Sequence, residues 1–409
     1  MASSTADAIF LALPAERWQQ PDRYTIDGVT PSRAARPENR EEVASLLSAA
    51  TSAGLVVVPQ GARTALELGR PLAGYDVALD LTALDRIVAY EADDLTITVE
   101  AGVTLSQLQA HLDSHGQYLS TDPPTGDHVT IGGLLATARS GAWRGHLPSA
   151  RDLVLGIEVA LADGQLVKSG GRVVKNVSGY DLHRMHTGAL GAFGVIVEAS
   201  FKLAPVPAAT RTLVLRCDDT DAAEALVFDL WNRSTGARAL TLLSAPAAAR
   251  LELSESPHVL VELAGVASAV ERGAEVTAGL GHVVEGPASL WNDLRTLQAD
   301  GTTVLRLTVP ASAVRETIDD ATRAGCAAWG HLAAGSVVAL APDADAATIM
   351  ALRTSAEQLG GTLQIESGSA SLRGDVDPFN VGEPDLVRSL KAQFDPTGTL
   401  SRGRWMEGV

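Results

Sequence analysis

The chain has 409 residues, 46% of them hydrophobic and 20% charged, which is typical of a globular protein with two domains. Its formal net charge of −17 argues against a nucleic-acid-binding protein, because phosphate recognition needs clustered lysines and arginines. Two cysteines, Cys217 and Cys326, cannot build a disulfide framework or a cysteine-ligated zinc or iron–sulfur site. No apolar run approaches the roughly 20 residues of a membrane span. We therefore expect a cytoplasmic protein with no membrane span.

Residues 31–205 alternate between helical and extended patterns. Apolar residues at helical spacing and a stop at Gly54 predict a helix over 38–54. Asp163-Gly164 between two apolar runs predicts a β-hairpin. The full set comprises helices over 38–54 and 105–115, and strands over 55–58, 77–81, 87–90, 95–99, 154–160, 165–168 and 195–203.

Two loops rich in Gly and Thr follow extended segments in this region, at 59–64 and 130–141. Glycine lets the backbone approach a phosphate closely, and consecutive amides form an anion-binding nest. The amides that open a helix after Gly133 would add their partial positive charge. Neither loop matches the Gly-x-Gly-x-x-Gly dinucleotide fingerprint or a P-loop. The two loops therefore predict a bulky phosphorylated ligand that is not bound in the Rossmann manner.

Beyond a linker at 205–208, a strand–helix–strand–strand–helix–strand pattern occurs twice. This pattern predicts two ferredoxin-like halves, each an antiparallel sheet with helices on one face. Its predicted strands are 211–216, 240–243, 259–263, 282–285, 303–309, 327–332, 337–340 and 362–365. Its predicted helices are 221–231, 267–279, 312–324 and 346–359, with a further helix at 290–298 between the halves. The tail from 374 is expected to return to the first domain.

The segments 59–64, 130–133, 149–156, 171–182, 194–198 and 394–403 resemble flavoproteins of the vanillyl-alcohol oxidase type, which share the FAD-binding module of p-cresol methylhydroxylase (PCMH). The run Lys175-Asn-Val-Ser-Gly-Tyr-Asp-Leu182 is similar to the glycolate- and lactate-oxidising branch. The resemblance implies an α+β fold with a two-subdomain PCMH-type FAD-binding domain and a ferredoxin-like cap. The implied divisions are an N-terminal segment at 1–30, the FAD-binding domain at 31–207, the cap at 208–373 and the tail at 374–409.

The resemblance also implies where FAD lies. Pyrophosphate would contact the 60–64 and 130–133 loops, and Arg63 would either pair with it or point to solvent. We expect FAD to be non-covalent, because the first loop has no His or Cys and the second has only His128. The implied cofactor-binding residues are Gln60, Gly61, Ala62, Arg63, Thr64, Thr125, Thr130, Ile131, Gly132, Gly133, Ala138, Gly141, Ser149, Gly194, Val195 and Ile196.

The cap departs from the catalytic members of this branch. They carry a His-x-Gly-Asp-Gly-Asn-x-His type motif, whereas residues 329–336 keep one imidazole, His331, so we expect no metal site. The catalytic residues stay unknown. The candidates are His331, which could equally be a hydrogen-bonded strand histidine, Lys175, which could cap a turn, and Arg144 and Arg151, which could be surface charges. His183 and His186, three residues apart, are expected on the solvated surface.

Three functions follow from these residues and the resemblance. The first is an FAD-binding subunit of a glycolate (2-hydroxy acid) oxidase complex, with a larger catalytic flavin subunit and an iron–sulfur subunit as partners. Membrane association would then come through those partners. The second is a self-sufficient FAD-dependent dehydrogenase of glycolate or D-lactate, with His331 or Lys175 as base and Arg144 or Arg151 holding the carboxylate. The third is a scaffold that keeps the fold without the flavin.

Overall fold

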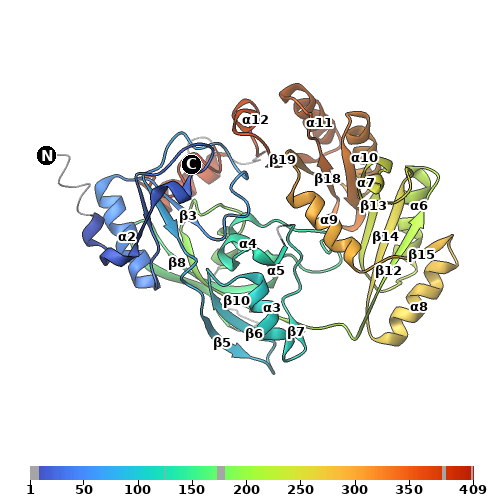
Figure 1. Cartoon of the computed structure of the whole chain (residues 1–409), viewed down its shortest axis with the longest axis horizontal. Coiled ribbons are helices and arrows are strands. Elements are labelled where there is room, and N and C mark those ends of the chain that lie inside the picture. The colour runs from blue at the N-terminus through green and yellow to red at the C-terminus, as the bar shows by residue number, and fades with distance from the viewer. Residues whose placement is uncertain (1–8, 125, 173–179, 380–383, 407–408) are drawn as a thin grey trace.

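The computed structural model describes residues 9–409 apart from 125, 173–179, 380–383 and 407–408. Figure 1 shows two parts side by side, a blue-to-green N-terminal half and a yellow-to-orange C-terminal half. The chain crosses between them once at residues 203–209 and returns near the end, so that the C-terminus lies close to β3 (Val57–Gln60).

A small mixed sheet begins the N-terminal half, in the order β1-β2-β4-β3, with β1 antiparallel to β2 and the other pairs parallel. The helix predicted over 38–54 is α2 (Arg40–Ala53). Asn39 caps it by accepting a hydrogen bond from the Glu42 amide at 2.8 Å, and Gly54 ends it in the left-handed region with φ 69°. The apolar face of α2 is buried in one core with β3 and β4. The remaining strands here are β1 (Trp18–Gln19), β2 (Arg33–Ala35) and β4 (Val77–Asp80).

A five-stranded antiparallel sheet follows, in the order β5-β6-β10-β8-β9. The predicted hairpin is confirmed: β8 and β9 pair antiparallel, and Gly164 in their turn has φ 88°. Helices α3 and α4 pack their apolar residues into the core of this sheet. The elements are β5 (Ile87–Glu91), β6 (Thr96–Glu100), α3 (Leu105–Asp113), α4 (Ile131–Thr137), α5 (Ala150–Leu153), β8 (Val154–Ala160), β9 (Leu166–Gly170) and β10 (Val195–Lys202); β7 (Gln117–Tyr118) and β11 (Ala204–Pro205) form a separate pair.

The C-terminal half is built on one eight-stranded antiparallel sheet, in the order β15-β12-β14-β13-β17-β18-β16-β19. Each set of four strands has the ferredoxin-like order, so the predicted ferredoxin-like strand pattern is confirmed. The two halves join into a single sheet through β13 and β17. The strands are β12 (Ala209–Arg216), β13 (Ala237–Leu243), β14 (His258–Gly265), β15 (Val283–Glu285), β16 (Val304–Thr308), β17 (Ala327–His331), β18 (Ser336–Leu340) and β19 (Thr362–Ser367).

Helices cover both faces of this cap sheet, which corrects the prediction of helices on one face. One face packs against α6 (Thr220–Asn232), α8 (Ala267–Ala278), α10 (Val314–Arg323) and α11 (Ala346–Gln358). The other face buries α7 (Ala245–Arg250), which was not predicted, and α9 (Ser289–Ala299). Ala142, from a loop of the N-terminal half, belongs to this second core, so the second face is the one that meets the N-terminal half.

The tail contains α12 (Ala370–Asp375) and α13 (Pro384–Phe394) and then runs beside β3. Leu400 forms a parallel bridge with Val57. The Asp395 carboxylate accepts hydrogen bonds from the amides of Thr399 and Leu400 at 2.8 and 2.7 Å, which fixes the turn before this bridge. The division of the chain at 207/208 and 373/374 stays a proposal.

Candidate cofactor cleft

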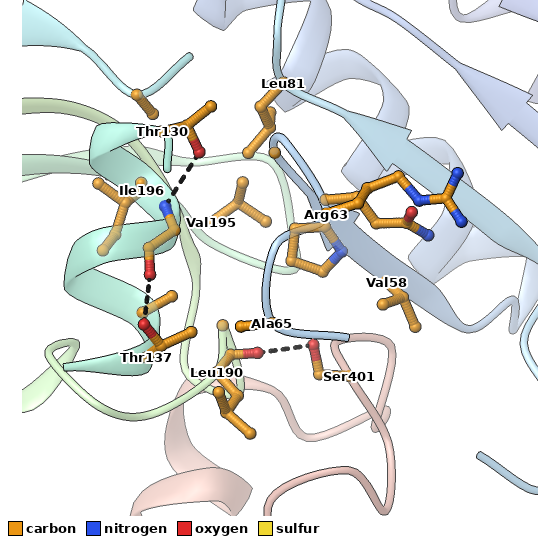
Figure 2. Close-up of a pocket in the computed structure, with 18 of the residues that line it drawn as sticks. Val58, Arg63, Ala65, Leu81, Thr130, Thr137, Leu190, Val195, Ile196 and Ser401 are labelled. Carbon is orange, nitrogen blue, oxygen red and sulfur yellow. Dashed lines mark hydrogen bonds between the residues drawn. The ribbon is translucent and has the colours of Figure 1, made fainter. Parts of the chain in front are cut away.

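A cleft with about 880 Å³ of empty space lies where β3, α4 and β10 meet the tail. In Figure 2, α4 with Thr130 and Thr137 faces the loop of residues 61–65 across the cleft, and Leu190 and Ser401 lie at one end. The hydroxyl of Ser401 donates to the carbonyl of Leu190 at 3.0 Å. The lining is Val58, Pro59, Gln60, Gly61, Ala62, Arg63, Thr64, Ala65, Leu66, Leu81, Ala101, Thr130, Gly132, Gly133, Ala136, Thr137, Leu190, Gly191, Gly194, Val195, Ile196, Ser401 and Arg404.

The first glycine loop presents open backbone donors to this cleft. The amides of residues 61–65 donate to no acceptor among the described residues. A Cβ atom on Gly61 would lie 2.1 Å from Thr130 Oγ1, so glycine is needed here for the two loops to touch. Successive open amides in a concave loop suit an anion.

The second glycine loop brings its backbone close to the cleft but has no open amides at residues 131–133. The amides of Ile131 and Gly132 donate to the carbonyls of Val103 and Ala101, each at 2.8 Å. The Gly133 amide donates to Thr130 Oγ1 at 3.3 Å, which is the helix cap (Figure 2). Helix α4 therefore contributes to the cleft the backbone of Gly132 and Gly133, which carries no side chains, and the partial positive charge at the N-terminal end of its helix dipole.

Arg63 does not simply point to solvent, and its pairing with the pyrophosphate stays a prediction. It has φ 62°, and its guanidinium donates to the carbonyls of Arg23 and Thr25 and lies 5.7 Å from the centre of the Tyr24 ring. Its buried Nε has no hydrogen-bond partner among the described residues. The side chain thus packs on the N-terminal segment while one donor stays open.

Eleven of the sixteen predicted cofactor residues line the cleft: Gln60, Gly61, Ala62, Arg63, Thr64, Thr130, Gly132, Gly133, Gly194, Val195 and Ile196. The others do not. Ile131 is fully buried in the core, Ala138 ends α4 and Ser149 caps α5. Gly141 packs on Asp122, and Thr125 lies outside the described residues.

Sequence reasoning missed the lining that comes from the α4 interior, residues 190–191 and the tail. Gly191 has φ 76° and packs against Pro59, so its glycine was a local signal that could have been used. The tail residues Ser401 and Arg404 gave no such signal, because only the folded chain brings them to the cleft.

Comparison with known proteins identifies the ligand class. The sequence family described as FAD binding domain matches residues 31–170. Glycolate oxidase subunit GlcD of Bacillus subtilis (strain 168) is 27% identical in an alignment that is 418 positions long and covers 91% of this chain and 88% of that protein. The solved structure of p-cresol methylhydroxylase with substrate bound superposes with a TM-score of 0.78 at 16% identity, covering 98% of this chain and 96% of that one. Residues 31–170 are an FAD-binding domain, and the chain has the fold of p-cresol methylhydroxylase.

A second relative is more similar over a shorter stretch. Glycolate oxidase subunit GlcE of Escherichia coli (strain K12) is 39% identical over 158 residues, which are 38% of this chain and 45% of that protein. The predicted fold class is confirmed by the p-cresol methylhydroxylase superposition and by the cap sheet. With an FAD-binding domain and its similarity to a glycolate oxidase subunit, this flavoprotein is an FAD-dependent oxidoreductase.

The cleft residues fit FAD. Gln60 Oε1 and Arg404 Nη1 are buried and have no hydrogen-bond partner among the described residues, and each needs a polar group that the cleft ligand can supply. Aliphatic Val195 and Ile196 offer an apolar wall for a flat ring, and the open amides of 61–65 offer donors to phosphate. The prediction that FAD is non-covalent stays a prediction; His128 is exposed and does not line the cleft.

A buried carboxylate joins the FAD-binding half of the flavoprotein to its cap. Asp122 accepts hydrogen bonds from the amides of Gly141 and Trp143 at 3.3 and 2.9 Å. The Trp143 indole donates to the carboxylate of Glu262 on β14 at 2.7 Å, and Arg238 pairs with the same carboxylate while stacking on the indole at 4.3 Å. Asp122 therefore fixes the loop that anchors the cap sheet.

The ionisation of Asp122 makes this link sensitive to pH. Burial raises the pKa of Asp122 to about 7, and the hydrogen bonds from Trp143 and Gly141 offset this only in part. The pKa of Asp122 is higher in the folded than in the unfolded protein, so protonation of this carboxyl stabilises the fold. That stabilisation is complete below about pH 3.9 and is lost as the pH rises towards 7.

We expect Asp122→Asn to stabilise the protein at pH 8 relative to pH 5. At each pH, the free energy of unfolding of wild type is subtracted from that of the variant. This difference should be higher at pH 8 than at pH 5 by at least about 1 kcal/mol, roughly the equivalent of one pKa unit. Thermal unfolding of both proteins at pH 5 and pH 8 measures this. An identical effect of the substitution at both pH values would contradict the assignment of a raised pKa.

The four catalytic candidates lie in different surroundings. His331 is fully buried and Arg144 is half-buried, both near the contact of the cap with the 139–147 loop. Arg151 is exposed on α5, and Lys175 lies outside the described residues. In the part of the chain that the structure describes, no group of three or more His, Cys, Asp or Glu residues could hold a metal ion.

His183 and His186 are buried, so the expectation of a solvated surface is wrong. They are 5% and 6% exposed. Burial lowers the pKa of His186 to about 4, and its ring packs edge-on against Phe394. The segment is a 3₁₀ turn, whose short length gave no periodicity from which burial could be read. Across the described ranges, no helix is both long and apolar enough to span a membrane.

Proposed function

We propose that this flavoprotein is an FAD-binding subunit of a complex that oxidises glycolate or another 2-hydroxy acid. The family supports an oxidoreductase, and relatives named as glycolate oxidase subunits support that substrate class. In the proposed complex a larger catalytic flavin subunit oxidises the substrate and an iron–sulfur subunit carries the electrons onward. The complex is cytoplasmic, and any attachment to a membrane comes through those partners. Bound FAD supplies an acceptor for the two electrons removed from an alcohol carbon.

The burial and lowered basicity of His331 are the main support for the subunit proposal. Its Nδ1 lies 3.0 Å from Thr241 Oγ1 in the buried face of the cap sheet. Burial, followed by the positive charge of Arg306, lowers the pKa of His331 to about 3. A general base works best with a pKa near the working pH, so this imidazole is a weak acceptor for the substrate hydroxyl proton. This supports placing the substrate chemistry on a partner subunit.

Arg144 favours a second candidate, a self-sufficient dehydrogenase of glycolate or D-lactate. Its guanidinium contacts Ser140 Oγ at 3.4 Å and forms no ion pair with a described residue. Burial, and then the charge of neighbouring Arg306, lower the pKa of Arg144, so the site disfavours further positive charge. A carboxylate bound here would relieve that cost through a charge-assisted hydrogen bond.

The visible spectrum of the purified holoprotein under anaerobic conditions separates the two candidates. Glycolate and D-lactate are added in turn, and the flavin absorbance is followed. A flavin that stays oxidised supports the subunit, whereas bleaching supports the dehydrogenase, and His331→Ala then tests the base. A colourless protein that takes up no added FAD would overturn both.

Arg144→Gln tests the proposed carboxylate contact. Losing a hydrogen bond between charged groups should raise the glycolate concentration that half-saturates the flavin difference spectrum by about tenfold or more. Arg272→Gln, at an exposed position on α8, is the matched control. Half-saturation at the wild-type concentration in the Arg144 variant would remove this residue from the site.

A further inference from the structure

The C-terminal tail places a buried guanidinium in the FAD cleft. Arg404 is 5% exposed and lines the cleft together with Ser401. Its Nη2 donates to the carbonyls of Leu66 and Leu68 at 2.5 and 2.8 Å, which fixes the side chain beside the first glycine loop. Its Nη1 finds no hydrogen-bond acceptor among the described residues. An open donor of a buried charged group is costly unless a ligand satisfies it.

The carboxylate closest to this donor is already in use. Asp27 Oδ2 lies 3.9 Å from Arg404 Nη1, beyond hydrogen-bonding distance, while the Asp27 carboxylate pairs directly with the fully buried Arg373. Two guanidinium groups therefore share one carboxylate, and positive charge is in excess. Burial lowers the pKa of Arg404 only to about 10, so the group is cationic at neutral pH.

The excess charge lies on the same cleft as the open amides of 61–65 and the unpaired Nε of Arg63. All three are donors, and the diphosphate carries the formal negative charges of FAD. We propose that Arg404 is a cofactor-binding residue whose Nη1 donates a charge-assisted hydrogen bond to a phosphate oxygen of FAD. The tail thereby completes the cofactor site. This inference rests on the FAD assignment and not on the proposed substrate.

Titration of the full-length apoprotein with FAD and with riboflavin, which lacks phosphate, tests the role of Arg404. Arg404→Gln should weaken FAD binding about 10- to 100-fold, the range for a hydrogen bond to a charged group, and leave riboflavin binding unchanged. Arg404→Lys should recover part of the loss. Arg402→Gln is the control, because Arg402 is an exposed tail arginine that donates to the Gly398 and Thr397 carbonyls and does not line the cleft.

A purely structural role gives a different pattern. Arg404 also supports the 66–68 segment, so a structural role would lower the melting temperature of the apoprotein and weaken both ligands equally, which would overturn the proposal. If Arg404→Gln does not fold or riboflavin binding is too weak to measure, wild type and Arg404→Lys are compared by FAD titration and by the melting temperature of the apoprotein. Weaker FAD binding by Arg404→Lys at an unchanged melting temperature supports the phosphate contact, and equal FAD affinity overturns it. Whether glycolate reduces the flavin decides between the two candidate functions and leaves this inference unchanged.

Discussion

Gly133→Trp should abolish measurable FAD binding and leave the fold intact. Gly133 lines the cleft in the first turn of α4, where a Cβ atom would meet only Thr130 Oγ1 at 3.1 Å and Val129 Cγ2 at 3.5 Å. The helix can therefore accept a side chain with a shift of a few tenths of an ångström, but an indole has to occupy the space expected for the cofactor. We expect a loss of affinity of at least about 100-fold, by exclusion of a ligand from a preformed cleft.

Fluorescence titration of the apoprotein with FAD measures this loss, and circular dichroism checks the fold. Gly74→Trp is the matched control, because Gly74 is exposed and a Cβ atom there meets nothing within 4 Å. Normal FAD binding by the Gly133 variant would place the phosphates elsewhere in the chain.

Local patterns allowed the secondary structure to be predicted, because each element carries its own signal. The cap pattern of strands and helices was predicted element by element, since apolar spacing and glycine stops lie within each segment. Joining the two cap halves was not predictable. The contact is a short pairing of Leu242 with Gly330 and of Leu243 with Trp329, between strands about 90 residues apart. Helix α7 was missed because six residues are too short to show periodicity.

The candidate site divides in the same way. Both glycine loops were predicted from local composition, since close backbone approach requires glycine at positions such as Gly61. The remote parts of the lining were not predicted. Arg404 is more than 330 residues from the carbonyls that hold it, and no local pattern encodes that distance. The open amides lie in the first loop rather than in α4 because of the acceptors that each amide meets in the folded chain, and local sequence does not specify these acceptors.

Glu366→Gln should cost the folded protein about 3–5 kcal/mol, the cost of removing one partner of a buried ion pair. The Glu366 carboxylate on β19 is 3% exposed and lies 2.5 Å from Arg306 Nε and 3.2 Å from Arg139 Nη2. Gln298 donates to it at 2.9 Å. Arg139 belongs to the FAD-binding half and Arg306 to the cap, so this carboxylate neutralises charge from both sides. Without it, two guanidinium groups stay buried and unbalanced.

Urea unfolding of the wild type and the variant in the same flavin state measures the cost. Glu285→Gln is the control: Glu285 pairs with Arg211 in an exposed ion pair at the sheet edge, so its loss should leave the midpoint essentially unchanged. The double variant Glu366→Gln/Arg306→Met should lose less free energy of unfolding than the two single variants together, by more than about 1 kcal/mol. The reason is that each substitution removes a charge that the other substitution alone would leave unpaired.

The same carboxylate should govern the acid limit of the fold. Burial alone would raise the pKa of Glu366, but the charges of Arg306 and Arg139 outweigh it and lower the pKa to about 2. The folded pKa lies below the unfolded value of about 4.3, so the stabilisation is complete above that pH and is lost as the pH falls towards 2. The stability difference between wild type and Glu366→Gln should therefore shrink steadily from pH 5 to pH 2. A difference that stays constant over this range would mean that the carboxylate contributes by shape alone, and that neutral packing rather than charge joins the cap to the FAD-binding half.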